Sequence, residues 1–173
     1  PGLPAAMGCG EAQPAMVMDY TEVVLKLKAP TNANSFSFNF QFFSAEYPEF
    51  VCTTFNDEFL VLMEGSKEFD MPTNISFDDQ KNPVTVNNAF FTACKNGSDP
   101  HTQHCKKPVT EIAGTGYDGT SFGTDPVGGS TGWLTTTAPV TPGEEFTLHF
   151  IIFDEGDHIL DSAALIDNFK WSV

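Results

Sequence analysis

The chain has 173 residues, 40% of them hydrophobic, and its 8 Lys and Arg against 23 Asp and Glu give a formal net charge of −15. This balance argues against nucleic acid and anionic membrane surfaces as partners, because both are negatively charged. The hydrophobic content excludes a disordered chain, and no apolar stretch reaches the ~20 residues that span a bilayer. We therefore expect a cation-binding or simply highly soluble exterior, without membrane insertion in this segment.

The chain divides at about residue 16. Residues 1–15 are rich in Pro, Gly and Ala without periodicity, and they predict an extended lead-in held by Cys9. Residues 16–173 predict one β-sandwich domain. Because the chain begins at Pro1, with neither Met nor a signal-peptide pattern, we interpret it as a segment of a longer protein whose anchor lies elsewhere.

The clearest local pattern is SFSFNFQF at 35–42. Its four Phe residues alternate strictly with polar residues, and a period of two places all four rings on one face of a strand. A helix would scatter the same rings around its axis.

The remaining strands follow from similar but weaker patterns. We expect them at 16–28, 59–63, 75–77, 84–92, 133–140, 146–153 and 163–171. Residues 95–130 predict a long irregular stretch that is either functional or pinned by a disulfide. Since no segment shows a convincing helical period, the sequence predicts an all-β fold, a two-sheet antiparallel β-sandwich of jelly-roll type with long loops.

Four cysteines allow three disulfide pairings. We favour Cys94 with Cys105, which closes a short hydrophilic loop, and Cys9 with Cys52, which ties the lead-in to the body. Two disulfides imply an oxidising, extracellular setting. The alternative is a zinc site formed by Cys105 with His101 and His104, although zinc ligands usually follow a tighter spacing.

The sequence DEGDHILD at 154–161 carries four carboxylates within eight residues. Crowded carboxylates splay into water, share protons or surround a cation, and Gly156 permits a tight turn around an ion. The loop does not match an EF-hand, and a solvated hairpin turn explains it equally well.

A second acidic loop follows the four-Phe strand and shifts the balance towards a cation. If the two loops converge, they supply enough oxygens to bind calcium, which prefers hard oxygen ligands and tolerates irregular geometry. Asp118, flanked by Gly119, is a further candidate, although an ordinary turn is the simpler interpretation. The predicted metal ligands are Glu46, Asn56, Asp57, Asp118, Asp154, Asp157 and Asp161.

Aromatic residues in predicted loops provide candidate ligand contacts. Tyr47, Tyr117 and Trp133 can stack on sugars if their rings are exposed, or they can cap the core. Catalysis is the weaker hypothesis: no nucleophile elbow, HExxH motif or phosphate loop is present, and only a carboxylate pair such as Glu46 with Asp154 could serve a polysaccharide hydrolase.

Several segments together resemble one family. SFSFNFQFFSAEYPEFVCTTFNDEF, NISFDDQKNPVTVNNAFFTAC, GTGYDGT and FTLHFIIFDEGDHILDSAALIDNFKW are similar to the choice-of-anchor L domain of bacterial surface proteins, particularly its myxobacterial-type members. The resemblance covers most of residues 20–171. It implies an exported β module attached to the cell surface through a segment outside this chain.

The sequence therefore predicts a non-catalytic, calcium-stabilised surface module for adhesion or extracellular ligand binding, with a glycan or a surface protein as partner. The alternatives are a calcium-dependent, lectin-like module and a polysaccharide hydrolase.

Overall fold

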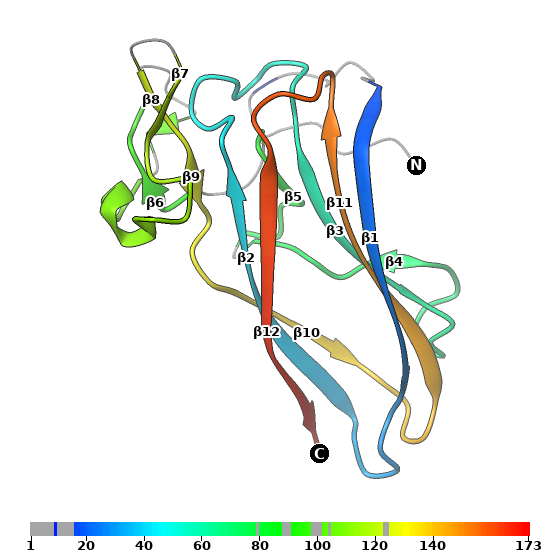
Figure 1. Cartoon of the computed structure of the whole chain (residues 1–173). Helices are drawn as coiled ribbons and strands as arrows, with labels where there is room; N and C mark the ends of the chain where they lie inside the picture. Colours follow the sequence, from blue (N-terminus) through cyan, green and yellow to red (C-terminus); the bar gives the residue numbers. More distant parts are fainter. Residues whose placement is uncertain are drawn as a thin grey trace.

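The computed structural model describes residues 9, 16–78, 80–87, 91–97, 102–103, 105–122 and 125–173. Its architecture is two antiparallel sheets packed face to face (Figure 1). The first sheet has the order β1-β11-β3-β4, and β5 also pairs with β3. Its strands are β1 (Val17–Lys28), β11 (Glu145–Glu155), β3 (Glu58–Glu64), β4 (Thr73–Asn74) and β5 (Val84–Thr85).

The second sheet is built on β2, which pairs with β12 along its length and with β10 and β9 in turn. Its strands are β2 (Ser35–Ser44), β12 (Ser162–Ser172), β10 (Leu134–Pro139), β9 (Gly129–Ser130) and β6 (Ala93–Cys94). A hairpin of β7 (Thr120–Phe122) and β8 (Asp125–Val127) and a short 3₁₀-helix, η2 (Val109–Ile112), lie beside this sheet (Figure 1). The described residues contain no α-helix.

The core lies between the sheets and depends on the alternating Phe residues of β2. Phe36, Phe38, Phe40 and Phe42 are fully buried. The ring of Phe38 packs on Phe150 of β11 at 5.4 Å between centroids, and Phe40 packs on Phe59 of β3 at 5.3 Å. The prediction of one ring-bearing face is confirmed, and this face joins the two sheets.

The predicted all-β fold and its two antiparallel sheets are confirmed; the jelly-roll connectivity stays a prediction. The strand expected at 75–77 is wrong, because β4 ends at Asn74. Ile75 still donates its N–H to Val61 O at 2.9 Å, but the N–H of Val61 is bonded by side chains, Asn74 Oδ1 at 3.3 Å and Ser76 Oγ at 2.9 Å. The strand expected at 84–92 is described as β5 only, and its residues 88–90 lie outside the described residues.

The irregular stretch expected at 95–130 holds β7, β8, β9 and η2. Each of these elements is only two to four residues long, which is too short for a period of two or of 3.6 to be visible in the sequence. Disulfides join Cys9 with Cys52 and Cys94 with Cys105, the two pairs that the sequence favours. The lead-in at 1–15 lies outside the described residues except for Cys9.

Among the described residues, no helix has the length and apolar character needed to cross a membrane.

The Phe face gives the first prediction. Phe38→Ala removes a fully buried ring from the centre of the core, so we expect it to lower the free energy of unfolding by about 3–5 kcal/mol. Ser37→Ala on the opposite face of the same strand is the control and should change it little. Urea unfolding measures both variants, and equal effects would contradict the assigned faces.

Candidate metal centre

Four strand ends meet at one end of the sandwich. Glu46 lies two residues after the end of β2, and Asp57 directly precedes β3. Asp154 is the second-last residue of β11, and Ser162 is the first residue of β12. Figure 1 shows these strand ends together at the end of the molecule opposite the C-terminus. Residues that are far apart in the sequence therefore converge, as the two-loop hypothesis requires.

The strand register explains why two of these carboxylates face each other. In the β3 and β11 ladder, Phe59 pairs with Ile152 and Glu58 pairs with Phe153. One further step places Asp57 opposite Asp154. Since alternate residues of a strand share a face, both aspartates point the same way as Phe59 and Ile152, into the space between the sheets.

Glu46, Asp57 and Asp154 form the carboxylate triad of the candidate centre. Each offers one carboxylate oxygen, and these three oxygens lie within 4.8 Å of one another. The residues are 1%, 1% and 6% exposed. One oxygen of each carboxylate, Glu46 Oε2, Asp57 Oδ1 and Asp154 Oδ1, is buried without a hydrogen-bond partner. Unpaired buried oxygens are costly and mark a place where a ligand or proton is missing.

The other oxygens of the triad are held by neighbours. The hydroxyl of Ser162 donates to Asp57 Oδ2, and the backbone N–H of Asp57 donates to the Glu46 carboxylate. The amide of Glu46 donates to Ser44 Oγ at 3.0 Å. The carboxyl group of Asp57, when protonated, also donates a hydrogen bond to Asp154, so the triad is held together rather than splayed into water.

The electrostatics of the triad are those of crowded buried acids. Burial, followed by the neighbouring Asp154, raises the pKa of Glu46 to about 8 from an ordinary value of 4.5. Burial is also the largest cause that raises the pKa of Asp57 and of Asp154. Without a cation, the triad therefore retains protons at neutral pH.

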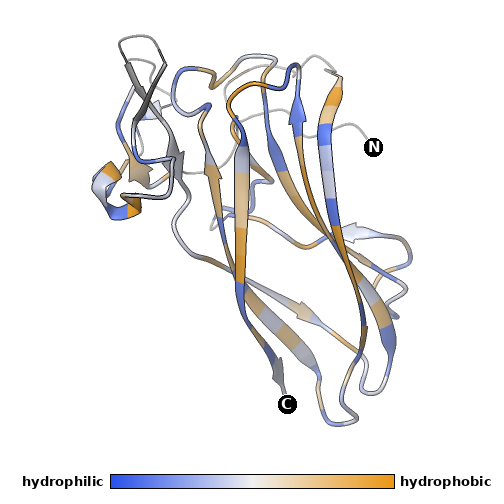
Figure 2. Ribbon diagram, in the orientation of Figure 1, coloured by the Kyte–Doolittle hydropathy of each residue, from blue (hydrophilic) through white to orange (hydrophobic). Residues whose placement is uncertain are grey.

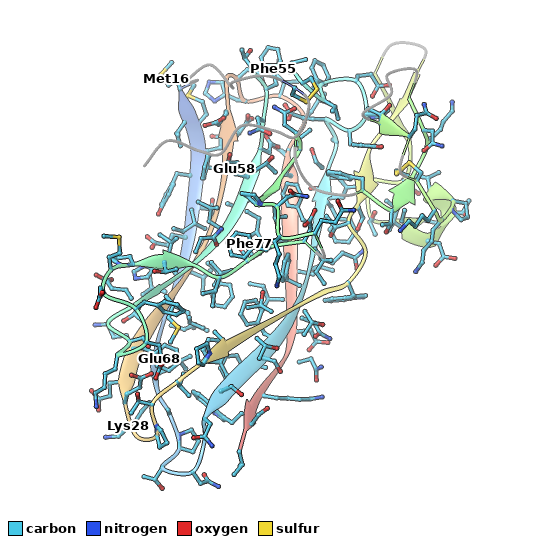
Figure 3. All side chains as sticks on the ribbon, turned by 180° about the vertical axis from the view of Figure 1, so that it is seen from behind. Met16, Lys28, Phe55, Glu58, Glu68 and Phe77 are labelled. Atoms are coloured by element: carbon cyan, nitrogen blue, oxygen red, sulfur yellow. A yellow bond between two sulfur atoms is a disulfide. The ribbon has the colours of Figure 1, made fainter. Side chains whose placement is uncertain are left out.

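A second acidic pair lies on the opposite face of the same strands. Glu58 and Glu155, 1% and 5% exposed, are one residue beyond the two aspartates and so face away from the core. The side-chain amide of Asn56 donates to Glu58 Oε1 at 3.2 Å, and burial raises the pKa of Glu58 to about 8. Glu58 lies towards the same end of the molecule as Met16 and Phe55 (Figure 3).

Gly156 brings the two acidic loops together. Its φ is +103°, and a Cβ at this position would lie 2.9 Å from Phe55 Cδ1 and 3.1 Å from Thr54 O. A side chain here would therefore separate the loops. Gly156 therefore permits the expected tight turn and also allows the two loops to approach each other closely.

An open pocket of about 340 Å³ adjoins the triad. Asp57 and Asp154 line it, whereas Glu46 is not part of its lining. The remaining lining residues are Asp19, Thr21, Tyr117, Ile152, Phe153, Asp161 and Ser162. A cation bound by the triad would consequently have one side directed at this pocket.

The predicted ligands outside the triad occupy other places. Asn56 bonds Glu58, and its Oδ1 accepts the amide of Asn87 at 2.9 Å. Asp118 accepts the amide of Gly114 at 2.8 Å, and Asp157 accepts that of Ile159 at 2.7 Å, so both stabilise turns. Asp161 is exposed at the rim of the pocket. The structure therefore brings together three of the seven candidates.

Among the candidate aromatic contacts, Tyr47 follows the second of the two interpretations and packs in the core. Tyr47 is 2% exposed, its ring stacks on Phe91 at 4.4 Å between centroids, and its hydroxyl donates to Thr102 O at 2.9 Å. Tyr47 is therefore part of the core cluster between the sheets. Tyr117 lines the pocket, and Trp133 is 54% exposed but outside the pocket lining.

Asp19 and Thr21 are site residues that the sequence did not predict, and Ser162, which lies in a segment that resembles the family, was not among the predicted ligands. Ser162 is found only once β12 is known to begin beside Asp57. Asp19 and Thr21 reach the pocket because β1 pairs with β11, a long-range register that leaves no local signal. The zinc alternative loses one ligand, since Cys105 is disulfide-bonded; His101 and His104 lie outside the described residues.

The donor set fits a hard cation. All three ligands of the triad are carboxylates, and the atoms without partners are oxygens. Oxygen-only sites favour calcium or magnesium over zinc or copper. The hydrolase alternative is less well placed, because Glu46 is 1% exposed and only Asp154 of its pair faces the pocket.

Comparisons with known proteins agree with the sequence resemblance. The family model of the choice-of-anchor L domain matches residues 10–170, nearly the whole chain. The chain belongs to the choice-of-anchor L domain family. No curated protein and no solved structure matches it. A choice-of-anchor L domain is a surface-associated module, whereas the myxobacterial type stays a prediction.

The buried acids predict how stability depends on pH. Their pKa values are raised in the folded state, that of Glu46 from 4.5 to about 8, so the folded protein binds more protons than the unfolded chain between these values. We expect the calcium-free domain to be most stable near pH 4.5 and to lose stability as pH rises towards 8.

Thermal unfolding in excess chelator across this pH range measures the effect. Glu46→Gln removes one titrating group and should flatten the profile, while Glu68→Gln, an exposed glutamate at the other end of the molecule (Figure 3), should not. A stability that rises from pH 4.5 to 8 without calcium would contradict the assignment.

Proposed function

We propose that this choice-of-anchor L domain is a calcium-stabilised, non-catalytic surface module that binds an extracellular ligand or mediates adhesion. The observation that carries the proposal is the carboxylate triad with its three unpaired, buried oxygens. Glu46, Asp57 and Asp154 would hold the ion.

Calcium is a better match to the triad than magnesium. Calcium accepts irregular coordination by six to eight oxygens, whereas magnesium requires near-ideal octahedral geometry and keeps several waters. The triad offers one unpaired oxygen from each of its three carboxylates, and oxygens reached through the adjoining pocket would complete the coordination. The ligands come from the ends of β2, β3 and β11, so the ion would tie both sheets together.

The ion would also remove an electrostatic penalty. The triad keeps three acids close together in a buried place, and their ionised forms repel one another. A divalent cation balances most of this charge and supplies the missing partners of the orphaned oxygens. Its role at this end of the sandwich would therefore be mainly structural, although one side faces the pocket.

The open pocket favours a second candidate, a lectin-like module in which a sugar completes the coordination of the ion. Four aspartates line the pocket, Asp19, Asp57, Asp154 and Asp161, so anionic ligands would be repelled. Neutral hydroxyl groups can coordinate calcium without that penalty. Tyr117 offers a partly exposed ring at the same pocket.

Thermal unfolding with calcium tests the proposal. Selective binding to the folded state must raise the melting temperature with calcium concentration, and we expect a calcium-specific rise of several degrees over a magnesium control at fixed ionic strength. Asp57→Asn should abolish this rise while leaving the metal-free protein as stable or more so, because a neutral amide can be buried without taking up a proton at neutral pH. Asp118→Asn is the matched control and should retain the full rise.

Two results would count against calcium at the triad: no shift for a protein shown to be metal-free at the start, or a shift that Asp57→Asn retains.

A glycan array with and without chelator tests the lectin candidate. If a sugar occupies the pocket, binding should disappear with chelator and fall roughly tenfold or more in Tyr117→Ala, since stacking on an aromatic ring would be lost. Trp133→Ala should leave binding unchanged, because Trp133 lies outside the pocket lining. Binding that survives the chelator would remove the ion from ligand recognition.

A further inference from the structure

Strand β1 is an unusually open edge. It has 12 residues, pairs only with β11 in the described ladders, and ten of its residues are exposed. Three consecutive hydrophobic residues at its centre, Val23, Val24 and Leu25, are 54%, 46% and 40% exposed. Figure 2 shows this hydrophobic stretch in the middle of the strand. Such an edge presents unpaired backbone donors and acceptors to any further strand.

Two of these side chains point to the core side yet remain exposed. Val23 pairs with Phe150 and Leu25 with Leu148, and both partners belong to the core, so Val23 and Leu25 share the inward face of the sheet. The opposing sheet ends at β12, which contacts β11. Its inward-facing Ile166 is also 44% exposed. The open side of the sandwich is therefore apolar on both of its edge strands.

We propose that β1 pairs with β1 of a second copy of this chain, antiparallel and centred on Val24, so that two sandwiches share one continuous sheet. Centring on Val24 places Val23 opposite the Leu25 of the second copy on the inward face. On the outward face it places Glu22 opposite Lys26.

Charge complementarity favours a second copy of β1 as the pairing strand, and it favours this register. The first half of β1 carries Asp19 and Glu22, and the second half carries Lys26 and Lys28. Antiparallel self-pairing centred on Val24 sets Glu22 of one strand against Lys26 of the other, twice per dimer. Opposite charges across a strand pair stabilise it, and like charges destabilise it.

The charged side chains keep capacity for a partner. Glu22 is exposed, and its carboxylate contacts His149 Nδ1 through Oε1 at 2.6 Å and accepts a hydrogen bond from Tyr20. Lys28 Nζ already bonds Glu145 Oε1 at 3.1 Å. Lys26 is exposed and has no ion pair among the described residues. Edge lysines usually discourage strand addition. Here Lys26 would face Glu22 of the second copy, so it would favour pairing with that strand in this register over pairing with other strands.

The same arrangement covers the apolar residues. The twofold axis of an antiparallel strand pair is perpendicular to the sheet, so the inward faces of both copies lie on one side. The two β12 strands would then flank the junction, with Ile166 directed towards Val23 and Leu25. In addition, the strand contains no Pro, and its register with β11 is regular from Thr21 to Lys28, which suits continuous pairing.

Cysteine cross-linking tests the register. In this pairing Val24 faces itself, and directly opposed residues are close enough for a disulfide, whereas the two copies of residue 26 are separated by about 13 Å. The four native cysteines are already paired. We expect Val24→Cys to give a covalent dimer under mild oxidation, and Lys26→Cys, its matched control on the same face, to give little.

Charge reversal provides an independent arm. Lys26→Glu sets like charges opposite each other twice per dimer, so we expect the dimer dissociation constant to rise by roughly tenfold in analytical ultracentrifugation. Lys106→Glu makes the same change on an exposed residue away from β1 and should not alter it. The inference is overturned if the native chain stays monomeric at every soluble concentration, if Val24→Cys and Lys26→Cys cross-link equally, or if Lys26→Glu dimerises like the native chain.

Discussion

Burial of carboxylates without partners is the constraint on which the acidic end of this domain depends. Glu46, Asp57 and Asp154 are withdrawn from water at the point where the two sheets meet, and each keeps one oxygen that no neighbour satisfies. A protein can tolerate such groups only by protonating them or by surrounding a cation. Either shared protons or a cation would join the ends of β2, β3 and β11. Only a cation would do so while the three acids are ionised at neutral pH.

The arrangement follows from simple strand geometry. The alternating Phe residues of β2 fix which face of that strand meets β3 and β11, and the β3 and β11 ladder then sets Asp57 opposite Asp154 on the core side. The same alternation turns Glu58 and Glu155 to the other face. Four adjacent acids are thus divided between two environments, and Gly156 lets the loops that carry them approach closely.

Much of this could be predicted from local sequence patterns. The period of two at 35–42 predicts β2 and its core face, and the acidic loops at 46–57 and 154–161 contain all three members of the triad. Other features depend on long-range pairing. Asp118 and Asp157 are carboxylates, as calcium ligands usually are, but they accept backbone hydrogen bonds within turns. Tyr47 is buried and stacks on Phe91. Ser162 bonds Asp57 because β12 begins beside it. Residue types indicate oxygen ligands; only the strand register decides which of them meet.

A crystal structure of the domain grown with calcium, with anomalous diffraction data, tests the central claim most directly. The account predicts one anomalous peak bonded to oxygens of Glu46, Asp57 and Asp154 at the ~2.3–2.6 Å typical of calcium. A well-ordered structure in which these carboxylates pair with each other through shared protons, while calcium is absent or lies elsewhere, would contradict it.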